Sequence, residues 1–585
     1  MTSELHVTEA KSQQELAATV ISPATAKFLS LAFVTLLLVP VVWQTATEIS
    51  SGKLFREFAA LNGFPTRQKL RAFDRDLDSA SVLREFVQPR VQAILSSGGG
   101  FGNEKAVLGR DGWIYYAPGL SYVFGAAFLD PGFLHMRTKR MVDKEGETDP
   151  NPDPRPALFD LMDDCRRWGI HLVLVPIPDK AMLQPSQITA RADSDTTVPD
   201  NPSFRLLLSQ LRAGGADIFD PRPAGIHRGE LRFLKQDTHW TPLYMEGCAA
   251  GLADHIAGLP VLPPRASQKR YVLQTENRSG YGDLVNMLKL PSRQAQFPVE
   301  AVLAHKVVDL ITGQIAAPDP EAPVLLLGDS FTNIYSLGAL NWGTGAGFGE
   351  HLAFNLNQPI DVIALNGAGA TGIRSELVRA AQEGRLNRKK VLVYEFAIRD
   401  LAVENWRRIR LPRPAVQPPP PIAAENRPMP AAASSPKGQA APNPSAEHTQ
   451  PGASTSAEEK PQNSAPLIQG SAPPGLQVVA QVEAVSRIPE PGTAPYKDCV
   501  TILKFTVLTV ERGEPGGKTI LAAFWGMKND SWTEAAQYKP GDTLRLSLIP
   551  FEKADPMARS VQRADDVQDY DSPLFWAAHA EVLKR

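Results

Sequence analysis

The pattern of apolar and polar positions first stands out near the N-terminus. Residues 28–46 are apolar along almost their whole length and contain no charged side chain, and about 20 such residues cross the hydrocarbon core of a bilayer. We therefore predict a single-pass transmembrane anchor over residues 27–47, after a tail of residues 1–26. Trp43 suits the membrane interface. A cleaved signal peptide is the main alternative, although the tail is long and no A-x-A cleavage pattern follows.

The next segment carries its apolar residues on one side of a helix. Between residues 68 and 95 they recur at helical spacing, beginning with Leu70, Phe73 and Leu77, as in an amphipathic helix. We predict a helical stalk within residues 48–101 that packs on the following domain. Gly98-Gly99-Gly100 ends it.

Residues 102–410 alternate short apolar runs with helical patterns. Such alternation predicts an α/β domain, in which a doubly wound parallel sheet is covered by helices on both faces. A pair of apolar runs around Gly109-Arg110-Asp111-Gly112 predicts a hairpin before the first long strand. The predicted sheet strands are at residues 171–176, 324–327, 362–365 and 391–394.

The C-terminal part changes character twice. Residues 411–475 are rich in Pro, Ala and Ser and almost lack aromatic residues, so we predict a semi-extended, disordered linker. Residues 476–585 are patterned again, with apolar Leu544, Leu546 and Leu548 alternating with polar neighbours. About 110 residues of short strands predict a small all-β domain, either an OB-like barrel or a sandwich.

Composition narrows the classes of function. The chain has 585 residues, too many for one core, and a net charge of −2, which lacks the basic excess of a nucleic-acid-binding protein. The three cysteines, Cys165, Cys248 and Cys499, show no CxxC spacing, so we predict no metal site and no cofactor. Cys165 and Cys248 fall in apolar helical patterns and are interpreted as buried small side chains.

Two motifs about ninety residues apart offer the residue types of a nucleophilic site. Asp237 and His239 lie just before Thr241-Pro242, a good helix start, and Ser330 follows the apolar run that ends in Gly-Asp. A serine needs a base to take its proton and a third group to orient that base. The ends of parallel strands are where such sites form, and a helix start adds N–H groups for an oxyanion. Each motif alone is more often a turn or a cap; together they predict Ser330 as nucleophile, His239 as base and Asp237 as its orienter.

Four further residues are weaker candidates. Asn366 could donate to an oxyanion, although a plain strand-to-helix turn explains it as well. Lys180 and Arg399 could bind an anionic glycan, or form structural salt bridges. Tyr281 could stack on a sugar ring, or pack in the core.

Between residues 102 and 410 the chain carries six short motifs in this order: residues 109–115, 176–180, 237–241, 280–284, 328–332 and 395–399. Together they resemble the alginate O-acetyltransferase family of the AlgJ and AlgX type, within the SGNH-hydrolase superfamily. The resemblance implies an SGNH-like fold over residues 102–410 and a Ser-His-Asp site in which the Asp-x-His motif precedes the serine. It also implies a partner, an MBOAT-type membrane acyltransferase that delivers acetyl groups across the membrane.

The expected function is O-acetylation of an exported bacterial polysaccharide, the acceptor, by a ping-pong reaction. A polysaccharide acetyl esterase and a non-catalytic scaffold of an export complex are the alternatives. We expect a single-pass inner-membrane protein whose catalytic domain is periplasmic. More Lys and Arg residues follow the span than precede it, which does not favour that orientation, but long domains translocate regardless of charge.

Overall fold

The computed structural model describes most of the chain outside three longer segments. The expected N-terminal tail, much of the expected stalk and the expected Pro-rich linker lie largely outside the described residues. Those described are residues 22–50, 70, 81–145, 147–188, 198–223, 230–262, 264, 267–291, 297–414, 475–489, 491, 497–529, 531–565, 567, 569 and 572–584.

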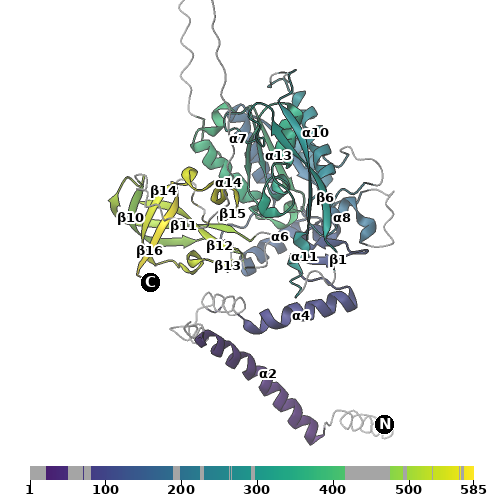
Figure 1. The fold of residues 1–585 in the computed structure, drawn as a ribbon, viewed down its shortest axis with the longest axis vertical. Helices are drawn as coiled ribbons and strands as arrows, with labels where there is room; N and C mark the ends of the chain where they lie inside the picture. Colours follow the sequence, from purple (N-terminus) through teal and green to yellow (C-terminus); the bar gives the residue numbers. More distant parts are fainter. Residues whose placement is uncertain are drawn as a thin grey trace, which may run out of the picture.

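Two helices precede the globular part (Figure 1). Helix α2 (Pro23–Ser50) has a mean hydropathy of 2.1 over its most apolar window and is long and apolar enough to cross a membrane. Helix α4 (Val82–Gly99) begins at the N-cap Ser81 and ends before Gly100, whose φ of 65° suits glycine. The two helices touch where the Trp43 ring meets Phe86, at 5.6 Å between centroids.

The apolar face of α4 does not pack on the following domain as predicted. Phe86, Val91 and Ile94 keep 47%, 46% and 69% of their surface exposed. The polar side chain of Gln92 makes the link instead, donating to the carbonyls of Phe101 and Gly102. The helix is therefore linked to the following domain by polar contacts, and its apolar side stays largely exposed.

The predicted parallel sheet is confirmed. Its five strands run in the order β4-β3-β9-β7-β8, and each neighbouring pair is parallel. Of these five strands β9 is the last along the chain, yet it lies between the earlier strands β3 and β7. The strands are β3 (His171–Ile177), β4 (Asp217–Ile218), β7 (Val324–Gly328), β8 (Asp361–Ala364) and β9 (Val391–Ala397).

Helices cover both faces of this sheet (Figure 1). Alternate residues of β7 point to opposite faces, so Leu325 and Leu327 enter one core while Val324 and Leu326 enter the other. The first core includes α7 (Pro154–Trp168), α9 (Phe204–Ala213) and α14 (Gly369–Gln382); the second includes α10 (Pro242–Ala257) and α13 (Phe348–Leu356).

Smaller elements complete this unit. The predicted hairpin is confirmed: β1 and β2 pair antiparallel around Asp111 and Gly112, both at positive φ. The long ribbon of β5 and β6 had no counterpart in the sequence prediction. The bounds are β1 (Ala106–Leu108), β2 (Ile114–Tyr116), α5 (Ala117–Phe124), α6 (Pro131–Arg140), α8 (Lys180–Leu183), β5 (Tyr271–Gly280), α11 (Asp283–Met287), β6 (Glu300–Asp309), α12 (Ser330–Asn333) and α15 (Asp400–Val403).

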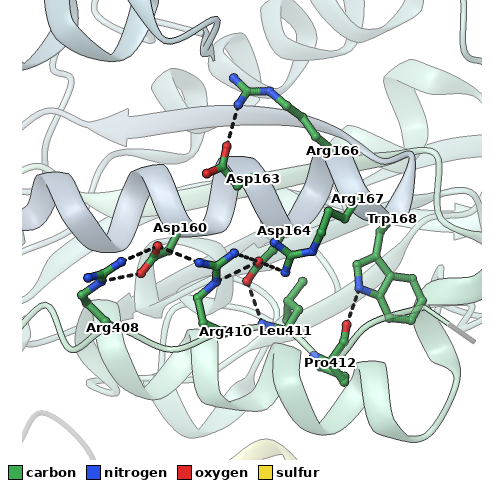
Figure 2. Close-up of polar contacts among 10 residues, drawn as sticks. All are labelled: Asp160, Asp163, Asp164, Arg166, Arg167, Trp168, Arg408, Arg410, Leu411 and Pro412. Atoms are coloured by element: carbon green, nitrogen blue, oxygen red, sulfur yellow. Dashed lines mark hydrogen bonds and ion pairs between the residues drawn. The ribbon is translucent and has the colours of Figure 1, made fainter.

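The segment after α15 is fastened to α7 (Figure 2). Arg408 binds Asp160 at 2.7 Å, and Arg410 reaches both Asp160 and Asp164 at 3.0 and 2.6 Å. Trp168 donates its indole N–H to the carbonyl of Pro412 at 2.9 Å. The chain thus stays bound to the α/β unit as far as residue 412.

The predicted small all-β domain is also confirmed. Strands β10, β11, β12, β16 and β14 pair in that order, and β14 pairs back with β10, so the sheet closes on itself. All of these pairs are antiparallel except β12 with β16. The bounds are β10 (Leu476–Val485), β11 (Cys499–Arg512), β12 (Thr519–Lys528), β13 (Ser531–Trp532), β14 (Thr543–Pro550), α16 (Pro556–Ser560), β15 (Gln562–Ala564) and β16 (Leu574–Lys584).

This barrel is docked on α14 by buried ion pairs. Arg563 of β15 binds Glu376 at 2.7 Å, and Asp565 binds Arg379 at 2.8 Å. Arg379 also binds Glu376 at 3.2 Å, and all four side chains are 9–12% exposed. Figure 1 shows the barrel beside α14 at one edge of the α/β unit.

Candidate active site

The nucleophile candidate sits where β7 turns into a short helix. Asp329 is the N-cap of α12, and its side chain accepts the N–H of Phe331 at 2.7 Å. Ser330 is the first residue of α12 and is partly exposed. A Cβ at Gly328 would lie 2.2 Å from Thr332 Oγ1 and 2.6 Å from Glu395 Oε2, so this turn has room only for glycine.

The structure brings all three predicted catalytic residues together. His239 Nε2 lies 2.8 Å from Ser330 Oγ, and His239 Nδ1 lies 2.6 Å from Asp237 Oδ1. The Asp237 and His239 side chains are 2% and 4% exposed. Their loop is fixed because Thr241 caps α10, with Pro242 at its first turn. The arrangement is a hydrogen-bonded Ser–His–Asp chain whose serine end faces solvent.

Asp237 is held by more groups than the sequence indicated. Its Oδ2 accepts the indole N–H of Trp342 at 2.8 Å and the backbone N–H of Asp283 at 3.0 Å. Burial alone would raise the pKa of Asp237, but the hydrogen bonds, first that from His239, prevail and bring it to about 2. Asp237 is therefore an anion at neutral pH. Trp342 was not predicted, because a single tryptophan in a Gly-rich loop carries no periodic signal.

His239 is correspondingly poised to take a proton. Burial lowers its pKa, but the hydrogen bond and charge of Asp237 outweigh burial, and the pKa is raised above its usual value. Asp283, within the motif 280–284, adds to this effect. Burial and the Asp237 charge raise the pKa of Asp283 itself to about 6. An imidazole placed between a carboxylate and a hydroxyl is the geometry of general-base activation.

Glu395 supports the nucleophile turn from the neighbouring strand β9. Its Oε2 accepts the backbone N–H of Asp329 at 3.0 Å and the hydroxyl of Thr332 at 2.8 Å. Burial, and then the charge of Asp329, raise the pKa of Glu395 well above its ordinary value. This contact joins the motifs 328–332 and 395–399 in the folded chain.

Asn366 lies beside the same turn. It is 4% exposed, and its Oδ1 accepts from Asn333 Nδ2 at 2.8 Å. That bond fixes the amide so that its own N–H₂ group is the donor left for a further partner. Gly367 and Gly369, at φ of 64° and 60°, shape the loop that follows.

The other sugar-binding candidates have different surroundings. Lys180 is 3% exposed and donates to the carbonyls of Ile114 and Lys235 at 2.7 and 3.2 Å; burial lowers its pKa to about 8. Lys180 was expected either to bind an anionic glycan or to form a structural salt bridge; its ammonium group instead donates to these two carbonyls and braces the segment before Asp237. Arg399 is mostly buried between Tyr116 and Phe331, with Asp179 at 3.7 Å. Half-buried Tyr281 packs against the small apolar cluster around α11.

A metal at this site would compete with bonds that already exist. Asp237, His239 and Asp283 carry possible ligand atoms within 4.8 Å of one another. Both oxygens of Asp237 already accept hydrogen bonds, and Nδ1 of His239 faces one of them. The donor set thus fits proton transfer better than coordination of a cation.

The α/β unit matches a family of known proteins. Residues 106–398, half of the chain, match the family described as SGNH hydrolase-like domain, acetyltransferase AlgX. A probable alginate O-acetylase AlgJ of Pseudomonas syringae pv. tomato is 25% identical over 40% of this chain and 55% of its own length. The Pseudomonas fluorescens protein of that name is 26% identical over 52% of this chain and 70% of its own length.

Among solved structures, the O-acetyltransferase domain of Pseudomonas putida AlgJ is 20% identical, with a TM-score of 0.38, over 51% of this chain and 93% of that domain. The chain spans just over half the length of the Pseudomonas syringae relative. The match to the family model lies within residues 106–398, in the α/β unit. On the match over residues 106–398, the chain belongs to the AlgX family of SGNH hydrolase-like acetyltransferases.

Proposed function

We propose that this chain is a polysaccharide O-acetyltransferase in which Ser330, His239 and Asp237 carry the acetyl group. The observation that supports the proposal most is the unbroken hydrogen-bonded chain from Asp237 through His239 to Ser330. Membership of an acetyltransferase family supports acetyl as the group that is transferred. The relatives named as alginate O-acetylases support a polysaccharide acceptor.

In the first half-reaction the Ser330 oxygen attacks the carbonyl carbon of an acetyl ester. Nε2 of His239 takes the hydroxyl proton, and the resulting imidazolium is stabilised by the Asp237 carboxylate. The tetrahedral oxyanion accepts hydrogen bonds from the backbone N–H of Ser330 and from the Asn366 amide. Collapse breaks the bond to the donor alcohol, which leaves with the proton from His239, and acetyl-Ser330 remains.

The second half-reaction runs the same steps with a sugar. His239 takes the proton of a sugar hydroxyl as its oxygen attacks the acetyl carbon. The intermediate collapses to the acetylated sugar, and the proton returns to Ser330. Water in place of the sugar hydroxyl gives acetate, the reaction of an esterase. The choice between the two acceptors therefore depends on what binds beside Ser330.

The proposed setting is the periplasmic face of the inner membrane. Helix α2 serves as a single-pass anchor, in keeping with its length and composition, and an MBOAT-type membrane acyltransferase supplies acetyl groups. The proposed organisation is an anchor (27–47), a stalk (48–101), a catalytic domain (102–410), a linker (411–475) and a β-domain (476–585). We propose that the β-domain is an OB-type barrel, because its closed strand order and its parallel β12–β16 pair match that topology.

The test uses purified full-length protein, an activated acetyl ester and oligosaccharides from the deacetylated exopolysaccharide of the host cell. We expect a covalent gain of one acetyl group on Ser330 by mass spectrometry and acetylated sugar as the product. Ser330→Ala should lose both. Unchanged turnover in Ser330→Ala would refute the nucleophile assignment, and acetate without acetylated sugar would establish the esterase. Polymer acetylation at its native level in Ser330→Ala cells would leave only the scaffold role.

A further inference from the structure

Helix α4 is amphipathic in the opposite sense to a helix that packs on a globular domain. Its polar side chains Gln92 and Ser96, four residues apart and therefore on one side, are buried. Val87, Val91 and Ile94 share the opposite side at helical spacing and are exposed. A helix in water turns its apolar stripe toward a core, so this orientation calls for an apolar partner outside the α/β unit.

The polar side of α4 is fixed to the start of the catalytic domain. Gln92 donates to the carbonyls of Phe101 and Gly102, each at 3.1 Å. The Ser96 hydroxyl donates to the carbonyl of Phe101, also at 3.1 Å. Turning the apolar side inward would break these buried hydrogen bonds and leave their donors without partners. The outward direction of the apolar stripe is therefore built into the fold.

Contacts with α2 place α4 at a particular depth relative to the proposed membrane span. Trp43 stands near the C-terminal end of the apolar stretch 28–46, the position that tryptophan takes at a membrane interface. Its ring meets Phe86 of α4 at 5.6 Å, and the side chain of Gln44 accepts the N–H of Val82 at 2.9 Å. The first turns of α4 thus lie at the level where α2 leaves the hydrocarbon core, and Figure 1 shows α4 between α2 and the α/β unit.

The charged side chains of α4 suit the same level. The Arg90 guanidinium stacks over the Phe86 ring at 3.7 Å from its centroid, and both side chains are exposed. An arginine that lies along apolar surface with its charge at the rim is the arrangement of an interfacial residue. The helix carries Arg84 and Arg90 against Glu85 alone, and this positive balance complements the phosphate groups of phospholipids.

We infer that α4 lies in the surface of the bilayer, with its apolar side at the boundary between headgroups and acyl chains and its polar side bound to the α/β unit. The partner of the exposed face is phospholipid. The inference rests on the proposed anchor, because α2 brings α4 to this depth. The segment between anchor and catalytic domain then ends in an in-plane support. It holds the catalytic domain against the membrane, where a donor delivered through the membrane arrives, instead of lifting the domain away.

The test uses full-length protein in lipid nanodiscs and a fluorophore on a single introduced cysteine. The three native cysteines are buried, so a thiol-reactive dye labels the introduced position. Ile94→Cys places the dye on the apolar side of α4. Glu85→Cys is the matched control: Glu85 is exposed and lies nine residues earlier on the same helix, which is about two and a half turns and therefore the opposite side.

Phospholipids that carry a nitroxide on the upper part of the acyl chain serve as the quencher. The apolar side of an in-plane helix sits about 5–10 Å into the headgroup and acyl boundary, so we expect quenching about threefold stronger for the Ile94 label than for the Glu85 label. Equal quenching of the two labels would overturn the inference. So would an Ile94 label whose emission is blue-shifted in detergent and indifferent to the nitroxide lipid, the result expected if a second copy of the chain covered this face.

The anchor is checked separately with Leu36→Cys, since Leu36 is exposed in the middle of α2. Its label should be quenched by a nitroxide placed deep in the acyl chains. If the Leu36 label is quenched and the Ile94 label is not, the anchor stands and the inference about α4 fails. If the Leu36 label is not quenched, the anchor fails and the inference with it. The proposed acetyl transfer fails by a different readout, ester cleavage that survives Ser330→Ala.

A charge placed in the stripe tests the same contact from the other direction. In protein labelled at Val87→Cys, the double change Val91→Glu/Ile94→Glu should weaken quenching by the nitroxide lipid about threefold, because carboxylates resist burial among acyl chains. Leu508→Glu/Val510→Glu is the matched control on exposed apolar residues of the barrel strand β11. Ester cleavage in detergent should stay within about twofold in both variants. Native quenching of the Val87 label in the α4 variant would refute the membrane contact.

Discussion

Glu395 offers the most direct check on how the nucleophile turn is built. Its carboxyl accepts two hydrogen bonds, from the Asp329 N–H and the Thr332 hydroxyl, and it occupies the space that Gly328 leaves open. The two variants to compare are Glu395→Gln and Glu395→Ala. Glutamine has the shape of glutamate and keeps an acceptor oxygen. Like the protonated carboxyl group, it is uncharged. Alanine removes the acceptor and leaves a cavity beneath the turn.

The expected magnitude follows from the orphaned donors. A buried donor that loses its partner costs about 1–3 kcal/mol, so Glu395→Ala should lower the free energy of unfolding by about 2–6 kcal/mol. Loss of the support also frees Ser330 from its place opposite His239. A shift of about 1 Å in a reacting group costs on the order of 100-fold in rate, and we expect kcat to fall by at least that factor.

The assay combines ester cleavage kinetics with chemical denaturation at several pH values. Glu395→Gln should keep kcat/KM within about threefold, a difference below about 0.7 kcal/mol. Because burial raises the pKa of Glu395, the carboxyl stabilises the fold fully below its unfolded pKa and loses that contribution as pH rises through the folded pKa. The free energy of unfolding of Glu395→Gln should lack this pH-dependent contribution. The reasoning is refuted if Glu395→Gln is as damaged as Glu395→Ala, or if Glu395→Ala retains native kcat.

Three further predictions concern the surroundings of the site. Trp342→Phe removes a hydrogen bond to the Asp237 carboxylate, worth about 1.5–3 kcal/mol, so kcat/KM for ester cleavage should fall about 10- to 100-fold; native kinetics would contradict the assignment. Asp283→Asn removes a charge that raises the pKa of His239, so the acidic limb of the kcat/KM pH profile should move to lower pH, and an unmoved or raised limb would exclude this coupling. Arg563→Ala breaks a buried ion pair and should lower the stability of the docked barrel by about 3 kcal/mol, seen as faster hydrogen exchange in residues 552–565 with ester cleavage unchanged; native exchange there would show that the pair does not hold the barrel.

The sequence alone predicted those features that leave a periodic or local mark. Buried parallel strands are short apolar runs, so their positions followed from the pattern, and helix starts such as Thr241-Pro242 placed the Asp237–His239 loop. Contacts between residues that are far apart in the sequence leave no such pattern. Trp342 lies 105 residues from Asp237, and only the folded sheet brings them together.

Two residue environments differ from what the sequence indicated. For Lys180 the sequence left open an anionic glycan or a structural salt bridge as its partner, and the apolar side of α4 was expected to pack on the following domain, because charge and hydrophobicity usually report exposure. In the structure Lys180 is buried against backbone carbonyls, and α4 keeps Phe86 and Ile94 exposed. Carbonyl acceptors can satisfy a buried ammonium, and a helix next to an apolar span need not hide its apolar side.

The position of β9 sets the order in which this protein can mature. Strand β9 is the last of the five sheet strands in the chain, yet it lies between β3 and β7. Synthesis starts at the N-terminus, so the two halves of the sheet lack the strand between them until residues 391–397 have been made. Glu395 reaches the nucleophile turn only then. Such long-range pairing is slow and leaves strand edges exposed in the meantime, so the half-finished protein is inactive and prone to aggregation until β9 is in place.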